Sequence, residues 1–213
     1  MSYTLAGLPV ISGTVYEPSV GVWHADLEVD AAENITGGVT LSLDGTTFKG
    51  TVKRGGIDGG RWSGLIVGGN LKLMTTLTGK SYVSCPLSIP LADIMTDSGE
   101  VLDAASEQLT ASTVPAWVRS RDTAGNALST LATSAGLIWR MTRAGTVLLS
   151  AQSFPAAEVS FTKIKNNTAN AVLTVAPDTS TLVQPATTVD GLAISYVVTA
   201  ISAESTRQHL YYT

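Results

Sequence analysis

The side chains that carry most protein chemistry are few in this chain. Its only histidines are His24 and His209, and its only cysteine is Cys85. His24 is followed at alternate positions by Asp26 and Glu28. On a strand this spacing puts all three side chains on one face, where they could bind a metal ion. The solvent side of a strand explains the same residues without a metal, and no further ligand motif accompanies them. We therefore predict no metal site.

Nucleophilic and acid–base catalysis have no better candidates. The chain lacks the G-x-S-x-G elbow of many hydrolases. Asp97 and Glu100 are spaced like a carboxylate pair for glycoside hydrolysis, but a helix end explains them better. The stretch 55–60, GGIDGG, lacks the Lys-Ser/Thr of a phosphate-binding loop and opens no helix, so it is typical of a hairpin turn. The sequence predicts no catalytic residue and no cofactor.

Four tryptophans offer aromatic surface. Trp23 and Trp139 fall on the core-facing sides of predicted strands, so we expect them to pack inside. Trp62 and Trp117 lie beside glycine-rich or proline-containing turns and are freer to meet a ligand or a partner. These two are the possible contact residues of the chain.

Charge is scarce. Only 14% of the 213 residues are charged, against about 25% in ordinary soluble proteins. The 13 Lys and Arg residues are scattered and the formal net charge is −4, which argues against a nucleic-acid partner. Low charge favours a large subunit interface, because interface cores are depleted in charged residues. The single cysteine excludes an internal disulfide and a cysteine-based zinc site.

We expect neither a signal peptide nor a membrane span. The start, MSYTLAGLPV, lacks a basic segment and a sustained apolar core. The longest apolar run, residues 193–201, contains polar residues and is too short to cross a bilayer. The sequence therefore predicts a soluble protein synthesised in a cytoplasm.

Residues 1–86 are predicted to form a β-domain. Residues 21–30 alternate between an apolar and a polar face, as a half-buried strand does. Asp44-Gly45 is a strong hairpin signal, and the stretch 55–60 is a second turn. The resulting meander must pack on another layer or close into a barrel.

Residues 87–150 change to an α/β pattern. One short helix is expected to end at Gly99, and a second, capped by Asp122, is expected to end before Gly136. A hairpin over residues 137–150 follows, and one face of its first strand is expected to receive the second helix. The sequence predicts that this part is an insertion into the β-structure.

Residues 151–213 return to β-structure. The predicted fold is therefore mainly β with an α/β insertion, that is, β-barrel modules with two short helices in the middle. Three parts are expected: a β-barrel or sheet domain at 1–86, the insertion at 87–150, and a β segment at 151–213 that completes or extends the barrel. Barrel strands are expected from both ends of the chain.

Three stretches carry a further pattern: GTVKRGG with LIVGG, then SIPLADIMTDSGEVLDAASEQL, then VPAWVRSRDTAGNALSTLATSAGLIWRMTRAGTVLL. A strand-rich entry leads to a helix with a Gly-Glu stop, a Trp-Arg strand, a second helix and a G-x-x-W-R-x-x-x-x-G-T-V hairpin that begins at Gly136. This pattern resembles the central baseplate and tail-hub proteins of tailed bacteriophages. The resemblance covers about residues 40–150.

The resemblance implies a non-enzymatic virion subunit with tail-tube-type barrels, in a hub or ring that links the tail tube to the spike and the baseplate periphery. The implied partners are other copies of the chain and other tail and baseplate proteins, including tube and spike, with no nucleic acid and no membrane insertion. The implied location is the tail baseplate of a virion, after synthesis in the bacterial host cytoplasm. Edge-strand and shape complementarity would drive assembly.

Two alternatives remain open. The first is a carbohydrate- or receptor-binding module of a tail tip, for which Trp62 and Trp117 would share one exposed patch. The second is a small tail-associated wall hydrolase, for which Asp97 and Glu100 are the candidate carboxylates.

Overall fold

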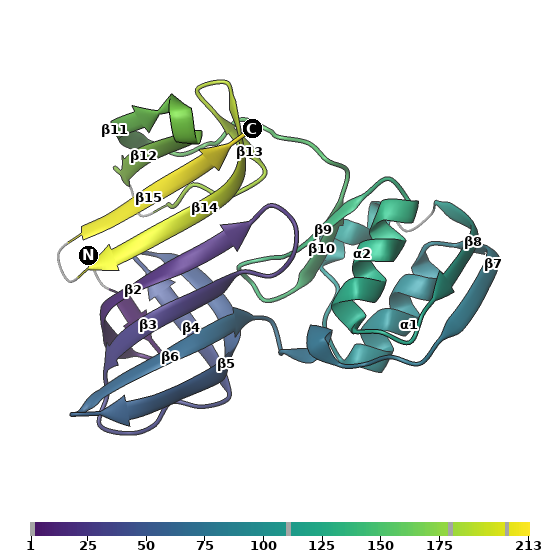
Figure 1. The fold of residues 1–213 in the computed structure, drawn as a ribbon, viewed down its shortest axis with the longest axis horizontal. Helices are drawn as coiled ribbons and strands as arrows, with labels where there is room; N and C mark the ends of the chain where they lie inside the picture. Colours follow the sequence, from purple (N-terminus) through teal and green to yellow (C-terminus); the bar gives the residue numbers. More distant parts are fainter. Residues whose placement is uncertain (1–2, 110–111, 179–180, 203–204) are drawn as a thin grey trace.

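A computed structural model describes residues 3–109, 112–178, 181–202 and 205–213. Over these residues strands dominate, and two α-helices lie in the middle of the chain (Figure 1). The predicted fold class, mainly β with an α/β insertion, is confirmed.

The first six strands form a closed barrel. They are β1 (Tyr3–Leu5), β2 (Leu8–Pro18), β3 (His24–Asp30), β4 (Gly38–Leu43), β5 (Thr46–Asp58) and β6 (Arg61–Gly68). All neighbours in the order β1-β4-β5-β6-β3-β2 are antiparallel, and β1 also pairs with β2. Within the described part of the chain this second pairing of β1 closes the barrel.

The predicted alternation and the first predicted turn are confirmed. On β3, Ala25, Leu27 and Val29 are buried in the barrel, and the residues between them point outward. Asp44 and Gly45 connect β4 to β5 with φ angles of 47° and 97°. Two successive positive φ values are typical of the tight turns that match the twist of a β-hairpin.

The glycine-rich stretch 55–60 is only partly a turn. Strand β5 continues to Asp58, and only the two glycines that follow it turn the chain, with φ angles of 57° and 80°. Gly55 stays in the strand, where a Cβ atom would collide with the ring of Trp62. Gly64 on β6 makes room for the same ring. Packing, not only turn geometry, accounts for the glycines here.

The last strands extend the barrel sheet. They are β11 (Phe161–Asn167), β12 (Val172–Pro177), β13 (Thr187–Val189), β14 (Leu192–Ser202) and β15 (Ser205–Tyr212). Strand β14 pairs with β2, and the sheet continues through β15 and β12 to β11, while β13 pairs with β14. The six strands within residues 3–68 close the barrel by themselves. The expected contribution of strands from both chain ends to barrel closure is therefore not seen. The three-part division of the chain stays a prediction.

The insertion lies to one side of the barrel, with β7 and β8 at its far end (Figure 1). Strands β7 and β8 pair with each other, as do β9 and β10, and α1 packs against α2. The elements of the insertion are η1 (Lys72–Met74), β7 (Lys80–Pro86), α1 (Ser88–Ser98), η2 (Ala104–Leu109), β8 (Thr113–Arg119), α2 (Ala124–Ser134), β9 (Ile138–Met141) and β10 (Val147–Ser150). A further short turn, η3 (Thr168–Asn170), lies later in the chain, between β11 and β12.

Both helices end where the sequence predicts, but the second begins with a different cap. Helix α1 stops at Gly99, which has a φ of 80°, and Gly136 after α2 has a φ of 67°. The N-cap of α2 is Thr123, whose hydroxyl accepts from the backbone N–H of Asn126 at 3.3 Å. The predicted cap, Asp122, binds the side-chain amide of Asn126 instead.

One large core runs from the barrel into the insertion, and a smaller core lies under β12, β14 and β15. The predicted contact of β9 with the second helix is confirmed. Trp139 and Met141 are buried, and Trp139 Nε1 donates to Ser129 Oγ of α2 at 2.9 Å. The insertion and the barrel therefore share one apolar interior.

Candidate assembly interface

His24 and its two carboxylate neighbours lie on the outer face of β3, but they do not converge. The His24 ring stacks on Tyr16, with centroids 4.7 Å apart and an interplanar angle of 14°. Burial lowers the pKa of His24, and the charge of Asp26 opposes that shift. Glu28 Oε1 accepts from Arg61 Nη1 at 2.9 Å. No group of three or more His, Cys, Asp or Glu side chains among the described residues could hold a metal ion.

Asp97 and Glu100 are each used in a different packing contact. Arg119, whose side chain is buried, donates from Nη2 to Asp97 Oδ2 at 2.6 Å, which ties β8 to α1. Glu100 is buried and accepts from the backbone N–H groups of Asn70 and Lys72, at 3.1 and 2.8 Å. The Glu100 contacts hold the segment that leaves the barrel, and the Asp97 contact holds β8 against α1. Both carboxylates therefore have a structural explanation.

The two possible contact residues, Trp62 and Trp117, are covered in the single chain. Trp62 is fully buried, and its Nε1 donates to Asn34 Oδ1 at 3.0 Å. Trp117 is 7% exposed and lies beside Tyr82, with ring centroids 5.5 Å apart. Neither ring offers an open platform to a sugar. Contact of either ring with a partner stays a prediction.

A buried ion pair joins the barrel to the hairpin of the insertion. Arg143, just before the hairpin turn, donates from Nε to Glu17 Oε2 at 2.7 Å and from Nη2 to Glu17 Oε1 at 2.8 Å. Arg143 Nη2 also donates to the carbonyl oxygen of Val183 at 2.9 Å. The guanidinium carbon lies 4.9 Å from the centre of the Phe48 ring. One side chain therefore links all three parts of the chain.

The loop before β13 is held from two sides. Gln208 on β15 accepts from the backbone N–H of Val183 at 2.9 Å and donates to its carbonyl oxygen at 3.1 Å. Arg140 Nη1 donates to the carbonyl oxygen of Pro185 at 3.0 Å. Burial lowers the pKa of Arg140, and the charge of Glu17 opposes that shift. These contacts fix the C-terminal sheet against the insertion.

Backbone pairing completes the junction. The N–H of Gly21 donates to the carbonyl oxygen of Trp139 at 2.9 Å, and the N–H of Met141 donates to the carbonyl oxygen of Gly21 at 2.7 Å. The N–H of Lys49 on the barrel donates to the carbonyl oxygen of Arg143 at 2.7 Å. The Trp-Arg hairpin on which the sequence resemblance rests is therefore the part of the insertion that docks on the barrel.

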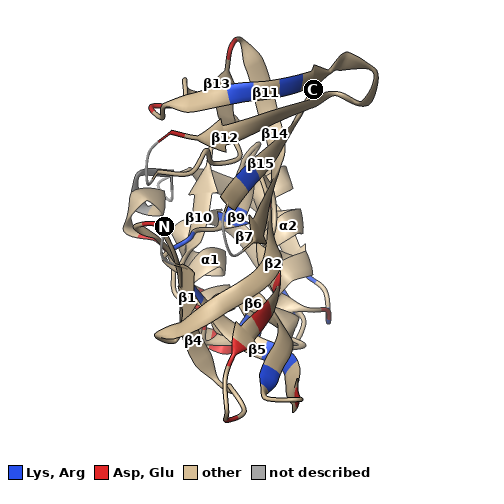
Figure 2. Cartoon of the chain, turned by 90° about the vertical axis from the view of Figure 1, so that its left-hand side faces the viewer, with Lys and Arg blue, Asp and Glu red and all other residues tan. Residues whose placement is uncertain are grey.

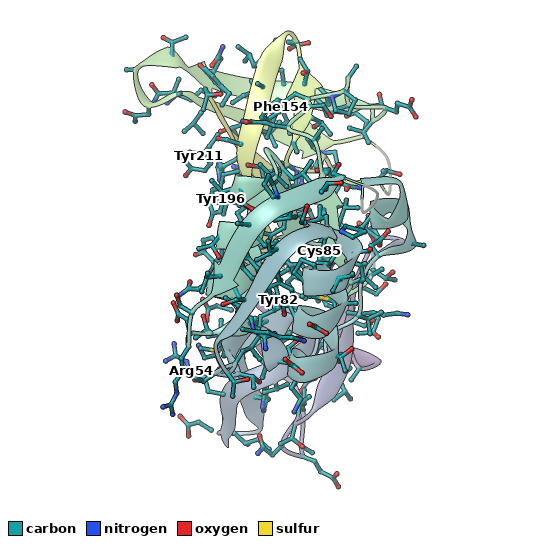
Figure 3. The ribbon with its side chains drawn as sticks, turned by 90° about the vertical axis from the view of Figure 1, so that its right-hand side faces the viewer. Arg54, Tyr82, Cys85, Phe154, Tyr196 and Tyr211 are labelled. Carbon is teal, nitrogen blue, oxygen red and sulfur yellow. The ribbon has the colours of Figure 1, made fainter. Side chains whose placement is uncertain are left out.

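A row of aromatic rings crosses the outer face of the extended sheet. Beyond the Tyr16–His24 stack, Tyr16 lies 6.4 Å from Tyr196, and Tyr196 lies 5.6 Å from Tyr211, between ring centroids. The rings belong to His24 on β3, Tyr16 on β2, Tyr196 on β14 and Tyr211 on β15. Figure 3 labels Tyr196 and Tyr211. Burial raises the pKa of Tyr196. Tyrosine is enriched at protein interfaces, so this row is a candidate contact surface.

Charged residues are sparse along the strands (Figure 2). Much of the sheet face that Figure 2 presents carries neither acidic nor basic residues, as the 14% charge of the sequence indicates. The described helices include none long and apolar enough to cross a membrane. Together with the aromatic row, this composition is typical of a surface that contacts protein.

A six-stranded barrel whose sheet continues into a second, open sheet, with an α/β insertion between them, is a distinctive fold. Comparison with protein-family models and with curated proteins gave no match. Solved structures match the chain from end to end. The 43 kDa tail protein of prophage MuSo2 from Shewanella oneidensis has a TM-score of 0.72 and 12% identity, over 99% of this chain and 96% of that chain.

Two further structures share the fold. The tail protein from Neisseria meningitidis MC58 has a TM-score of 0.64 and 12% identity, over 99% of this chain and 96% of that chain. The E. coli c3393 protein, a component of the type VI secretion system, has a TM-score of 0.58 and 11% identity, over 100% of this chain and 77% of that chain. The chain therefore has the fold of phage tail proteins, as the resemblance in its sequence implied.

Proposed function

We propose that this chain is a non-enzymatic structural subunit of a phage-type tail, located in the virion tail. The observation that carries the proposal is the end-to-end match to the Shewanella tail protein, which includes the barrel, the insertion and the extended sheet. The pattern in the sequence over about residues 40–150 points to the same class. Fold alone does not determine function, so the internal architecture supplies the second argument.

That architecture suits a part that transmits contacts between neighbours. The Glu17–Arg143 pair and the Val183–Gln208 contacts fasten the barrel, the insertion and the extended sheet to one another. The insertion projects to one side of the barrel (Figure 1). A subunit of this shape can meet one set of partners through its sheet and another through its insertion.

More specifically, we propose a hub or ring that links the tail tube to the spike and the baseplate periphery. Its partners would be further copies of itself and the tube and spike proteins. The c3393 protein is described as structurally similar to the T4 tail proteins gp27 and gp5, and its match to the whole of this chain supports a position in the tail. Head-to-tail contacts between identical subunits close into rings when the rotation permits.

The glycan-binding and wall-hydrolase alternatives have weaker support. The rings of Trp62 and Trp117 are covered. Asp97 and Glu100 make separate structural contacts, with Arg119 and with the backbone of Asn70 and Lys72. We favour the assembly role.

A genetic experiment tests this proposal. A stop codon at Trp23, in a phage that carries this gene, should abolish plaques on a non-suppressing host, and electron micrographs should show heads without complete tails. Supplying the intact gene from a plasmid should restore plaques and complete tails. Complete, infectious tails on the non-suppressing host would contradict a structural role in the tail.

A further inference from the structure

A small, largely enclosed cavity of about 60 Å³ lies where the barrel, the insertion and the loop before β13 meet. Four of the residues that line it carry charge or a polar side chain that matters here. They are Glu17 of β2, Arg140 and Arg143 of the β9–β10 hairpin, and Gln184 of the loop. In Figure 1 this hairpin lies between the barrel and the two helices. A group bound in the cavity would therefore touch all three parts of the chain.

The charged side chains that line the cavity are two guanidinium groups and one carboxylate. Arg143 donates to both oxygens of Glu17, at 2.7 and 2.8 Å, so this carboxylate is already paired. Arg140 forms no ion pair among the described residues. Its one side-chain hydrogen bond there runs from Nη1 to the carbonyl oxygen of Pro185, at 3.0 Å. The lining therefore carries one positive charge more than its carboxylate balances.

The next nearest source of negative charge, Asp103, is used elsewhere. It attracts Arg140, but it lies outside the cavity lining. Its Oδ2 accepts from Thr146 Oγ1 at 2.6 Å, and its Oδ1 accepts from the backbone N–H of Ala105 at 3.0 Å. Burial lowers the pKa of Arg140, and the charge of Arg143 adds to that shift. A cation withdrawn from water in this way is costly unless an opposite charge reaches it.

The volume of the cavity decides which kind of anion can reach Arg140. A cavity needs about 10–15 Å³ to hold one water molecule, so this one has room for a small ion with a few waters. Pockets for cofactors and drug-sized ligands measure about 300–1,000 Å³. The site therefore suits chloride or an inorganic anion of similar size, and it excludes sugars and nucleotides.

We propose that Arg140 binds a chloride ion in this cavity and that the side-chain amide of Gln184 donates a second hydrogen bond to the ion. The other N–H groups of Arg140 and the amide of Gln184 have no acceptor among the described residues, so they are available. The ion ties β9 to the loop before β13, next to the Pro185 contact. It also gives a structural purpose to the arginine of the Trp-Arg pair in the hairpin. The inference does not depend on the role in the tail.

Thermal unfolding of the full chain in sodium chloride and in sodium gluconate, at equal ionic strength, tests the site. Once chloride exceeds its Kd, each tenfold increase should raise the wild-type Tm by about 3–6 °C, whereas gluconate is too large to enter. Arg140→Met should abolish this rise. Arg61→Met removes one positive charge from an exposed ion pair, so this matched control should keep the rise. A wild-type Tm that ignores chloride would overturn the proposal, as would an equal rise in the Arg140→Met protein.

A second variant supplies the negative charge from the chain itself. Gln184 is exposed, so Gln184→Glu should leave the fold intact and place a carboxylate beside Arg140. Its Tm in gluconate should exceed that of the wild type, and its response to chloride should be lost. An undiminished chloride response in this variant would contradict the site.

Crystals of the wild type grown in sodium bromide give a direct readout. Anomalous scattering should place a bromide within hydrogen-bond distance of the Arg140 guanidinium. Bromide peaks only at other places on the surface would mean an adventitious ion only, and they would overturn the assignment.

Discussion

Replacing Arg143 by Met should lower the free energy of unfolding by about 3–5 kcal/mol, since it leaves the Glu17 carboxylate buried without a counter-charge. The side chains of Arg143 and Glu17 are only 12% and 5% exposed. The guanidinium also donates to the carbonyl oxygens of Leu182 and Val183, at 3.2 and 2.9 Å. The loss would therefore loosen the barrel from both later parts of the chain. Denaturant unfolding followed by circular dichroism measures the change.

Two controls separate this effect from a general loss of charge. Arg61→Met removes the ion-pair partner of Glu28. The side chain of Arg61 is 58% exposed and that of Glu28 is 32% exposed, so this variant should leave the unfolding midpoint almost unchanged. The double variant Glu17→Leu with Arg143→Met should recover part of the lost stability, because an apolar pair avoids the unpaired buried charge. An Arg143→Met protein as stable as the wild type would show that the pair does not hold the parts together.

Replacing Trp62 by Ala should cost about 3–5 kcal/mol of folding free energy, the range for removing a large buried aromatic side chain. The ring fills the space that Gly55 and Gly64 leave open. Trp62→Phe should cost less, because it keeps most of the packing and loses the bond to Asn34. Thermal unfolding of the three proteins measures the order.

The same experiment decides what kind of residue Trp62 is. If the ring were a surface contact residue, the alanine variant would unfold at the wild-type temperature and would lose only binding. Ile57, the 40% exposed cross-strand neighbour of Trp62, supplies the matched control, and Ile57→Ala should have a small effect.

The sequence predicted the elements well where local signals are strong. The alternation on β3, the Asp44-Gly45 turn and the Gly99 helix stop are local features, and each is confirmed. The N-cap of α2 was displaced by one residue, since adjacent Asp122 and Thr123 both favour capping. The structure selects the hydroxyl and gives the carboxylate to Asn126.

The long-range contacts were not predictable in the same way. Glu17 and Arg143 lie 126 residues apart, and no local pattern pairs them. One signal was present: Glu17 follows Val15 at the inward-facing positions of β2, and a buried carboxylate needs a partner. The burial of Trp62 was missed for a related reason. Glycines that suggested a turn instead make room for its ring, which only the pairing of β5 with β6 reveals.

The aromatic row on the extended sheet shows how surface chemistry adds to a fold comparison. The shared fold indicates a class of protein, but it does not say which surfaces meet. The row of Tyr16, Tyr196 and Tyr211 is a candidate surface for contacts between subunits.

The most direct test of the central claim, that this chain is a tail structural protein, is immunogold electron microscopy of phage particles with antibody raised against the purified chain. We expect gold at the end of the tail away from the head. Particles without gold, with the protein recovered free in the lysate, would contradict a role in the tail.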